Sequence, residues 1–154
     1  MPYYDRKPTR LKNFDYATEN YYFVTICANN KCCIFGRPGD LNAFGKIAKE
    51  GFAEMEKHFP TIKVDQCIVM PNHVHAIICI QADENPVSLT TVVGLYKSGV
   101  SRKIHRLQPE RNVWQRSFHD RVIRNQQEYE RIWNYVHYND QKWEQDCFYI
   151  KMEE

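Results

Sequence analysis

The stretch from Val69 to Ile80 constrains this chain more than any other. Apart from Pro71, Asn72 and two histidines it is apolar and largely β-branched, which predicts a buried strand with a break at the proline. His73 and His75 are two residues apart, so a strand turns both imidazoles to the same face. Unpartnered burial of two imidazoles is costly, and two imidazolium charges would repel each other. A divalent metal ion would satisfy both rings, which makes the two histidines candidate metal ligands. The alternative is that they are ordinary core or surface histidines of a strand.

A second informative stretch lies near the C-terminus, where a helix is expected over residues 126–138. Helical spacing places Tyr135 and Asn139 four residues apart on one face. On a helical wheel Tyr129 falls within the apolar stripe, Tyr138 falls on the opposite side, and Tyr135 lies at the edge of the stripe. We therefore predict that Tyr135 presents its hydroxyl at the rim of a groove. The alternative is a packing tyrosine whose hydroxyl reaches water.

Hydrophobic periodicity predicts an α+β fold. Runs of β-branched and aromatic residues indicate strands, and apolar residues at intervals of three and four indicate helices. The order strand, helix, strand, strand, helix, strand is the split β-α-β arrangement of ferredoxin-like folds. We expect one antiparallel sheet with two helices on one face. The predicted elements are strands at 21–28, 61–70, 73–80 and 113–115 and helices at 41–58, 89–106 and 126–138.

The last helix has to cover the other face of this sheet. Ile77 and Cys79 follow the two histidines on the same side of their strand, so that face of the sheet cannot be fully exposed to solvent. The helix over 126–138 carries an apolar stripe and has no other place to pack. We therefore expect it near the histidine face, with Tyr135 and Asn139 brought toward the imidazoles.

Length and charge suggest one domain that can contact a polyanion. We expect a single domain over residues 1–154, whose first 20 residues form a basic arm. The net charge is only +2, yet the basic residues are clustered. Separate basic patches can hold a phosphate backbone, although each can equally be an ordinary solvated face. The clusters are Arg6, Lys7, Arg10 and Lys12 in the arm, then Arg102, Lys103 and Arg106, and finally Arg116, Arg121 and Arg124.

Several classes of protein are disfavoured. The N-terminus has no apolar run of the signal-peptide type, and no segment approaches the ~20 apolar residues that span a bilayer. We therefore expect a soluble, cytoplasmic protein without a membrane partner. The six cysteines lack zinc-site spacing and are expected to be reduced.

Taken together, these motifs resemble the single-tyrosine HUH transposases of the IS200-like family, and most of all the REP-associated tyrosine transposases. The resemblance covers nearly the whole chain. One departure is Asn139-Asp140, where the family often has Asn-Pro, and a proline there would only end the helix. The matching segments are 10–15, 22–27, 69–75, 114–116, 120–125 and 135–139.

The resemblance implies a metal-dependent single-stranded DNA endonuclease and strand transferase. Such an enzyme holds Mg²⁺ or Mn²⁺ with two imidazoles and an amide oxygen, while a tyrosine attacks the scissile phosphate to give a 5′-phosphotyrosine link and a free 3′-OH. The implied partner is single-stranded or palindromic (REP-like) hairpin DNA, bound by a monomer or a homodimer. The implied site residues are His73, His75 and Asn139 for the metal and Tyr135 for the attack.

The resemblance also implies that the basic arm and the segment 116–124 contact DNA. Exposed aromatic side chains could in addition stack on unpaired bases. The stacking candidates are Trp114, Phe118 and Tyr16. The expected DNA-binding residues are Arg6, Lys7, Arg10, Lys12, Arg116, Arg121 and Arg124.

Two other functions stay open at this point. One is a non-catalytic, ferredoxin-like module that binds single-stranded nucleic acid. The other is a metal-dependent hydrolase or oxygenase with two histidines and a carboxylate, for which Asp65 or Asp120 would have to supply the carboxylate. Metal-dependent covalent capture of DNA distinguishes the transposase from both.

Overall fold

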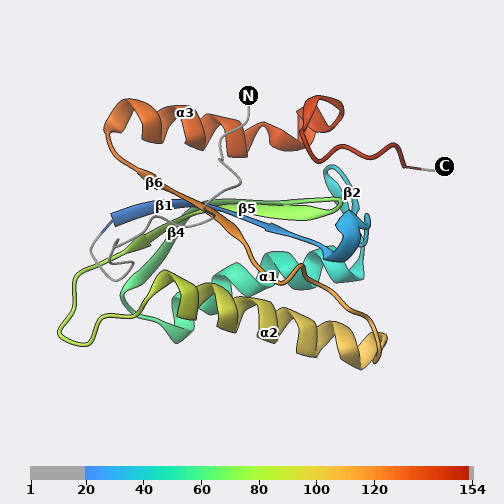
Figure 1. Ribbon diagram of the computed structural model, residues 1–154, viewed down its shortest axis with the longest axis horizontal. Coiled ribbons are helices and arrows are strands. Elements are labelled where there is room, and N and C mark those ends of the chain that lie inside the picture. The colour runs from blue at the N-terminus through green and yellow to red at the C-terminus, as the bar shows by residue number, and fades with distance from the viewer. Residues whose placement is uncertain (1–19, 153–154) are drawn as a thin grey trace.

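The computed structural model describes residues 20–152, so the predicted basic arm lies outside the described residues apart from its last position. One four-stranded antiparallel sheet has the strand order β4-β5-β1-β6. Two helices, α1 and α2, cover one face of the sheet, and α3 lies across the other (Figure 1). The bounds are β1 Asn20–Cys27, α1 Ala43–His58, β4 Ile62–Met70, β5 His73–Ile80, α2 Leu89–Leu107, β6 His119–Ile123 and α3 Gln126–His137.

This order confirms the expected α+β architecture. Strands β1 and β4 are joined through α1 and leave room between them, and β5 fills that room antiparallel to both. That is the split β-α-β arrangement of ferredoxin-like folds. No helix in the described range 20–152 is long and apolar enough to cross a bilayer.

One predicted helix start and the predicted fourth strand were wrong, each for a local reason. The first helix begins at Ala43 because residues 40–41 pair as a short strand, β3 Asp40–Leu41, with β2 Gly36–Arg37. Asn42 then caps the helix, its Oδ1 accepting from the Gly45 amide at 3.0 Å. The fourth strand is β6, not 113–115, where Trp114 makes only an isolated bridge to Ala28.

Each face of the sheet buries its own apolar cluster. The larger one packs the β1 and β5 side chains Tyr22, Val24, Ile26, Ile78 and Ile80 against α1 and α2. The smaller one lies under α3 and consists of Phe23, Ile77, Ile123, Ile132 and Val136. Because side chains alternate along a strand, this second face is also the face of the two histidines. The predicted placement of the last helix over that face is therefore confirmed.

Candidate metal and nucleophile site

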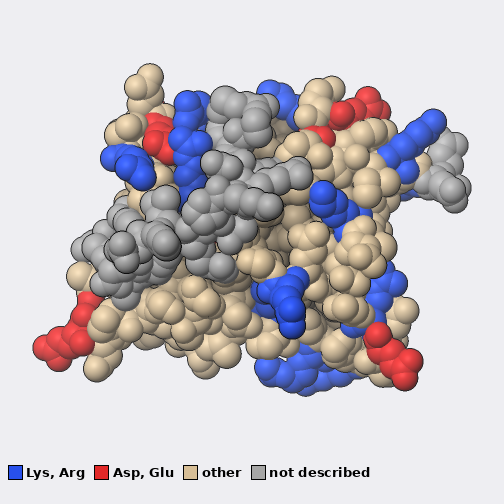
Figure 2. Space-filling view, in the orientation of Figure 1, with Lys and Arg blue, Asp and Glu red and all other residues tan. Residues whose placement is uncertain are grey.

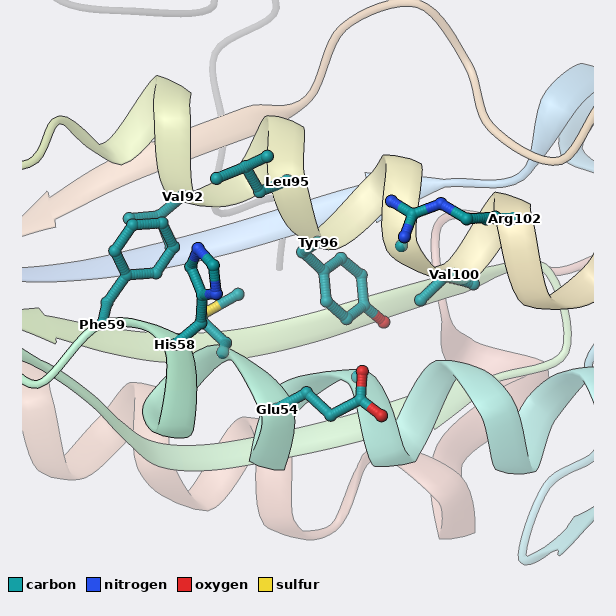
Figure 3. Close-up of a pocket in the computed structure, with 11 residues that line it drawn as sticks. Glu54, His58, Phe59, Val92, Leu95, Tyr96, Val100 and Arg102 are labelled. Atoms are coloured by element: carbon teal, nitrogen blue, oxygen red, sulfur yellow. The ribbon is translucent and has the colours of Figure 1, made fainter.

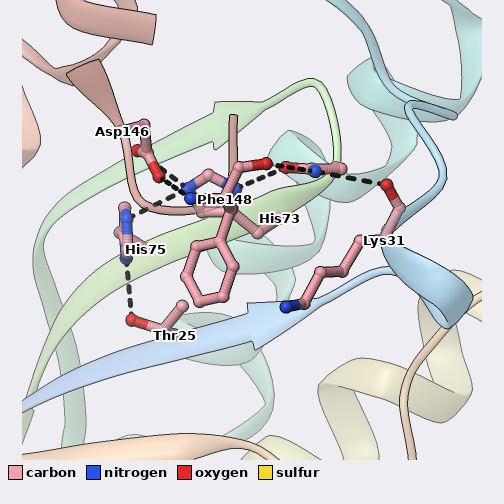
Figure 4. A network of polar contacts seen from close by, with 7 residues as sticks. Thr25, Lys31, His73, His75, Asp146 and Phe148 are labelled. Atoms are coloured by element: carbon pink, nitrogen blue, oxygen red, sulfur yellow. Dashed lines mark hydrogen bonds and ion pairs between the residues drawn. The ribbon is translucent and has the colours of Figure 1, made fainter. Parts of the chain in front are cut away.

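The two histidines begin β5 directly after a turn at residues 71–72. In the sheet register His73 lies opposite Cys27 and His75 lies opposite Thr25, both on β1. Both imidazoles are fully buried. Their Nε2 atoms are 3.1 Å apart (Figure 4). Two ligands placed at right angles about 2.1 Å from one ion lie about 3 Å apart, so the ring positions fit cis ligands of a single divalent cation.

Neighbouring polar groups fix how the rings are turned. His73 Nδ1 donates to Asn72 Oδ1 at 2.8 Å, which directs Nε2 toward His75 and Asp146. The Asn72 amide nitrogen in turn donates to the carbonyl oxygens of Phe148 at 2.8 Å and Lys31 at 3.2 Å. In the sequence Asn72 only follows the strand-breaking Pro71, and no pattern marks it as a functional residue. In the structure it is the fully buried group that orients a candidate ligand.

The second ring is held from β1. The Thr25 hydroxyl and His75 Nδ1 are 2.8 Å apart, and the Phe23 ring stacks on the imidazole at 5.2 Å between centroids. Burial, helped by the charge of His73, places the pKa of His75 well below its ordinary value of 6.5. His75 is therefore neutral at pH 7, which is the state in which an imidazole binds a metal.

A carboxylate that no sequence motif marks, Asp146, completes the group. The Asp146 side chain is fully buried, with Oδ2 3.3 Å from His73 Nε2. One ligand atom from each of His73, His75 and Asp146 lies within 4.8 Å of the others. No well-formed hydrogen bond from the described residues reaches Oδ2, whereas Oδ1 accepts from the Phe148 amide at 2.8 Å. A buried carboxylate oxygen that lacks a hydrogen bond and lies beside two imidazoles is a candidate metal ligand.

The charge state of this carboxylate suits a cation. Burial alone raises the pKa of Asp146, but the contact with His73, the histidine charges and the Phe148 amide lower it to about 2. Asp146 follows the 3₁₀ helix η2 Asn139–Gln145, and the chain then turns so that the Phe148 ring lies 4.9 Å from the His73 ring. This C-terminal segment both supplies the carboxylate and covers His73.

Tyr135 lies beside these groups, on the face of α3 that meets the sheet. Its half-buried ring is 5.5 Å from the His75 ring and 6.1 Å from the Phe23 ring. The other two tyrosines are placed differently. Tyr129 donates to Asp65 Oδ2 at 2.7 Å, and burial and that bond raise the pKa of its phenol; Tyr138 is 45% exposed. The wheel-based choice of Tyr135 as the candidate nucleophile therefore fits the geometry and stays a prediction.

α3 ends at His137, and Asn139 is the first residue of η2. Its side chain is buried and its Oδ1 has no hydrogen-bond partner within the described part of the chain. An orphaned amide oxygen on the segment that also carries Asp146 can serve as a further ligand. The predicted role of Asn139 as a metal ligand therefore stays a prediction, and Asp146 is a further candidate ligand.

The remaining predicted residues are spread out. Arg116 and Arg124 are exposed, while Arg121 donates through Nε to Glu128 Oε1 at 2.8 Å. Trp114 and Phe118 are only 7% and 5% exposed, so the idea that they stack on bases was wrong. The other candidates lie outside the described residues, namely Arg6, Lys7, Arg10, Lys12 and Tyr16.

Neither carboxylate proposed for a hydrolase or oxygenase joins the histidines. Asp65 is engaged with Tyr129, and Asp120 lies opposite Val24, whose side chain belongs to the other face of the sheet. A separate hollow of about 190 Å³ lies between α1 and α2, lined by side chains such as Met55 and Tyr96 (Figure 3). It is on the far side of the sheet from the histidines and contributes nothing to this site.

Comparison with known proteins shows the family to which the chain belongs. The chain matches the family described as "Transposase IS200 like" over residues 17–139. An uncharacterised protein of Haemophilus influenzae is 32% identical over 168 residues, covering 94% of this chain and 93% of that protein.

Two solved structures share the fold. A REP-associated tyrosine transposase bound to a REP hairpin superposes with a TM-score of 0.60 at 16% identity, over 86% of this chain and 72% of that one. A candidate transposase from Deinococcus radiodurans superposes with a TM-score of 0.55 at 14% identity, over 83% and 95%. Because the family match spans most of the sequence, the chain belongs to the IS200-like transposase family.

Proposed function

We propose that the protein is a metal-dependent single-stranded DNA endonuclease and strand transferase that uses Tyr135 as its nucleophile. The observation that carries the proposal is the position of the Tyr135 ring, 5.5 Å from a buried imidazole pair whose Nε2 atoms are spaced for one cation. Membership of a transposase family supplies the substrate class, which is DNA. The proposed metal ligands are His73, His75 and Asp146, with Asn139 as a further candidate.

Mg²⁺ or Mn²⁺ bound there would withdraw charge from the scissile phosphate and orient it for in-line attack. The residues of the chain do the rest. The Tyr135 oxygen forms a bond to phosphorus, the bond from phosphorus to the 3′ oxygen breaks, and the leaving 3′ oxygen takes up a proton while the phenol loses one. A 3′-OH of another strand can reverse the step. Phosphodiester and phosphotyrosine bonds are exchanged one for one, so strand transfer needs no external energy source.

Hairpin DNA is the proposed substrate. One structural relative has a REP hairpin bound, and attack by a side chain at the sheet face requires an accessible single strand beside any duplex. Arg116 and Arg124, both exposed, are proposed contacts to the DNA backbone, together with the basic residues of the arm. Arg121 is a weaker candidate because Glu128 neutralises it.

A denaturing gel tests the proposal. The protein is mixed with end-labelled hairpin DNA carrying single-stranded flanks, taken from repeats beside its own gene, with Mn²⁺ or Mg²⁺. We expect a covalent adduct that is absent in EDTA and absent for Tyr135→Phe. The matched control is Tyr138→Phe, which changes an exposed tyrosine on the same segment and should leave the adduct intact.

Two outcomes contradict the proposal. An adduct that persists in Tyr135→Phe would show that another residue is the nucleophile. If the DNA binds but no adduct forms under any metal condition, the non-catalytic nucleic-acid-binding module is the better description. The oxygenase alternative predicts no covalent DNA in any lane.

A further inference from the structure

A lysine without a carboxylate partner lies beside the candidate site. Lys31 is the last residue of the short 3₁₀ helix η1 Asn29–Lys31, which begins two residues after β1 ends. Its side chain is half-buried. It forms no ion pair with a carboxylate in the part of the chain that the structure describes. Partial burial of an ammonium group without a counter-charge is unfavourable, so a lysine held in this position needs a reason.

The ammonium group of Lys31 is held next to the segment that covers the histidines. Its Nζ lies 5.3 Å from the centre of the Phe148 ring, within the range of a cation–π contact. The same ring is 4.9 Å from the His73 ring, measured between centroids. Figure 4 shows the Lys31 side chain extending from the end of β1 toward Phe148. The positive charge is therefore one aromatic ring away from a candidate metal ligand.

The backbone that presents Lys31 has an uncommon conformation. Asn30 and Lys31 have φ angles of 54° and 53°, in the left-handed region. Asparagine adopts this region fairly readily, whereas lysine does so rarely. The Lys31 carbonyl accepts from the Asn72 side-chain amide at 3.2 Å, and the Lys31 backbone amide donates to the Ala28 carbonyl at 2.9 Å. These bonds fix a strained residue, and strained residues of this kind cluster at active sites and ligand clamps.

The overall charge of the molecule does not by itself define a path for a single strand. The net charge is only +2, and Figure 2 shows lysine and arginine side chains at several separate places on the face seen there. Individual cations beside the site then decide where phosphates are held, and phosphate contacts set the register of a bound strand. Lys31 suits this role because its amine is a compact charge with three N–H donors.

The location of Lys31 favours a phosphate next to the scissile one. In the proposed reaction the scissile phosphate lies by the Nε2 atoms of His73 and His75, near the Tyr135 ring. The Lys31 ammonium group is separated from His73 by the Phe148 ring, so it does not share that point. A strand that runs past the histidines toward the end of β1 would bring a neighbouring phosphate to the ammonium group.

We propose that the Lys31 ammonium group binds the phosphate adjacent to the scissile phosphate in the single-stranded flank and so positions the strand for attack by Tyr135. The identity of this ligand rests on the proposed function. Binding requires the amine to turn from the face of Phe148 to a phosphate oxygen, which its flexible four-carbon chain allows. Lys31 is thus a substrate-binding residue that exchanges no proton and no bond in the reaction.

A methylphosphonate scan tests the contact. This group replaces a charged phosphate oxygen by a methyl group, and one is placed at each phosphate of the flank in turn. The full-length protein is titrated with the labelled hairpins by fluorescence anisotropy in EDTA, where no metal-dependent cleavage occurs. We expect Lys31→Met to weaken binding of the unmodified probe about tenfold and to lower its salt slope by about 0.7. One methylphosphonate should weaken binding to the parent protein equally and weaken binding to Lys31→Met no further. That phosphate should adjoin the cleavage position that the adduct gel maps.

Further variants separate the charge of Lys31 from its place in the structure. Lys31→Arg keeps a cation and should restore both the binding and its dependence on that one phosphate. The matched control is Lys57→Met, which removes an exposed charge in the last turn of α1, on the other face of the sheet, and should bind every probe like the parent protein. Lys31→Met should also keep the melting temperature and the Mn²⁺ affinity of the parent protein, whereas a purely structural role through Asn72 would lower the Mn²⁺ affinity.

The proposal is overturned if Lys31→Met binds the unmodified probe normally, or if each methylphosphonate weakens its binding as much as it weakens that of the parent protein. It is also overturned if the coupled phosphate lies away from the cleavage position, or if the loss of DNA binding comes with a loss of Mn²⁺ affinity. Failure to form the Tyr135 adduct leaves the scan unaffected, because binding in EDTA requires no cleavage. The two proposals therefore fail separately.

Discussion

Replacing Asp146 with asparagine probes the candidate metal centre most directly, since the change keeps the shape of the side chain and removes its charge. In the metal-free protein the surroundings lower the pKa of this carboxyl from 3.8 to about 2. At 1.36 kcal/mol per pKa unit, that shift favours the charged form by about 2 kcal/mol. We therefore expect Asp146→Asn to lower the free energy of unfolding by about 2 kcal/mol at pH 7 in EDTA.

The pH dependence has a definite sign. The pKa of Asp146 is lower in the folded than in the unfolded chain, so its stabilisation is complete well above pH 4 and is lost as the pH falls toward 2. Roughly half of the difference between the two proteins should remain at pH 3. Urea unfolding in EDTA at pH 7, 5 and 3 measures it, with Glu144→Gln as the control because that carboxylate is exposed on the same segment. Equal stability at pH 7, or a gap that does not shrink in acid, would refute the reasoning.

The same variant tests metal binding. Asp146 is the one charged donor of the group, and its Oδ2 has no other well-formed bond within residues 20–152. Losing even a group that only orients a ligand usually costs 10- to 100-fold in metal affinity, so calorimetry should show Mn²⁺ binding weakened by about 100-fold or more. Unchanged Mn²⁺ affinity would contradict a ligand role for Asp146, and Asn139→Ala would then identify the amide as the third ligand.

Three smaller predictions follow from individual contacts. Asn72→Ala leaves the buried His73 Nδ1 without an acceptor and should cost about 1–3 kcal/mol in urea unfolding and about 10- to 100-fold in Mn²⁺ affinity; retention of both would contradict the orienting role. Ile132→Ala empties a fully buried position under α3 and should cost about 2–5 kcal/mol, with faster proteolysis of the C-terminal segment than in the parent protein. Tyr129→Phe breaks the bond to Asp65 and should lower the free energy of unfolding by about 1 kcal/mol while leaving the DNA adduct intact. Loss of the adduct would contradict the assignment of Tyr129 to a structural role.

The fold was predictable because its signals are local and periodic. Runs of β-branched and aromatic residues along β1 and β5 and the three-to-four spacing of the helices sufficed for the ferredoxin-like order. The position of α3 could be predicted because the histidine face of the sheet also carries Ile77, an apolar side chain that has to be shielded from solvent. The fourth strand was misplaced because β6 spans only five residues, too few to show a period, while the extended residues 113–115 imitate a strand.

The candidate site was predictable only where one element carries two of its residues. His73 and His75 share a strand, so their common face could be inferred from spacing. Asp146 reaches them because the chain turns back after η2, and no sequence period records a turn of that kind. One signal was available. Asp146 lies between Trp143 and Phe148 in a short aromatic stretch, and a carboxylate flanked by residues that tend to be buried needs a partner.

The end of β1 connects the parts of the molecule that the proposed reaction requires. The Ala28 amide donates to the Asn72 carbonyl at 2.8 Å, so the strand end is tied to the residue that orients His73. One residue earlier, the Cys27 carbonyl accepts from the Gln115 amide at 2.9 Å, in the loop that leads from α2 to β6. Asn72 also bonds to the Phe148 carbonyl, beside the segment that supplies Asp146. Hydrogen bonds at a single strand end therefore hold that loop, the imidazole pair and the segment with Asp146 in fixed relative positions, because two of them join backbone groups and the Asn72 side chain makes the others.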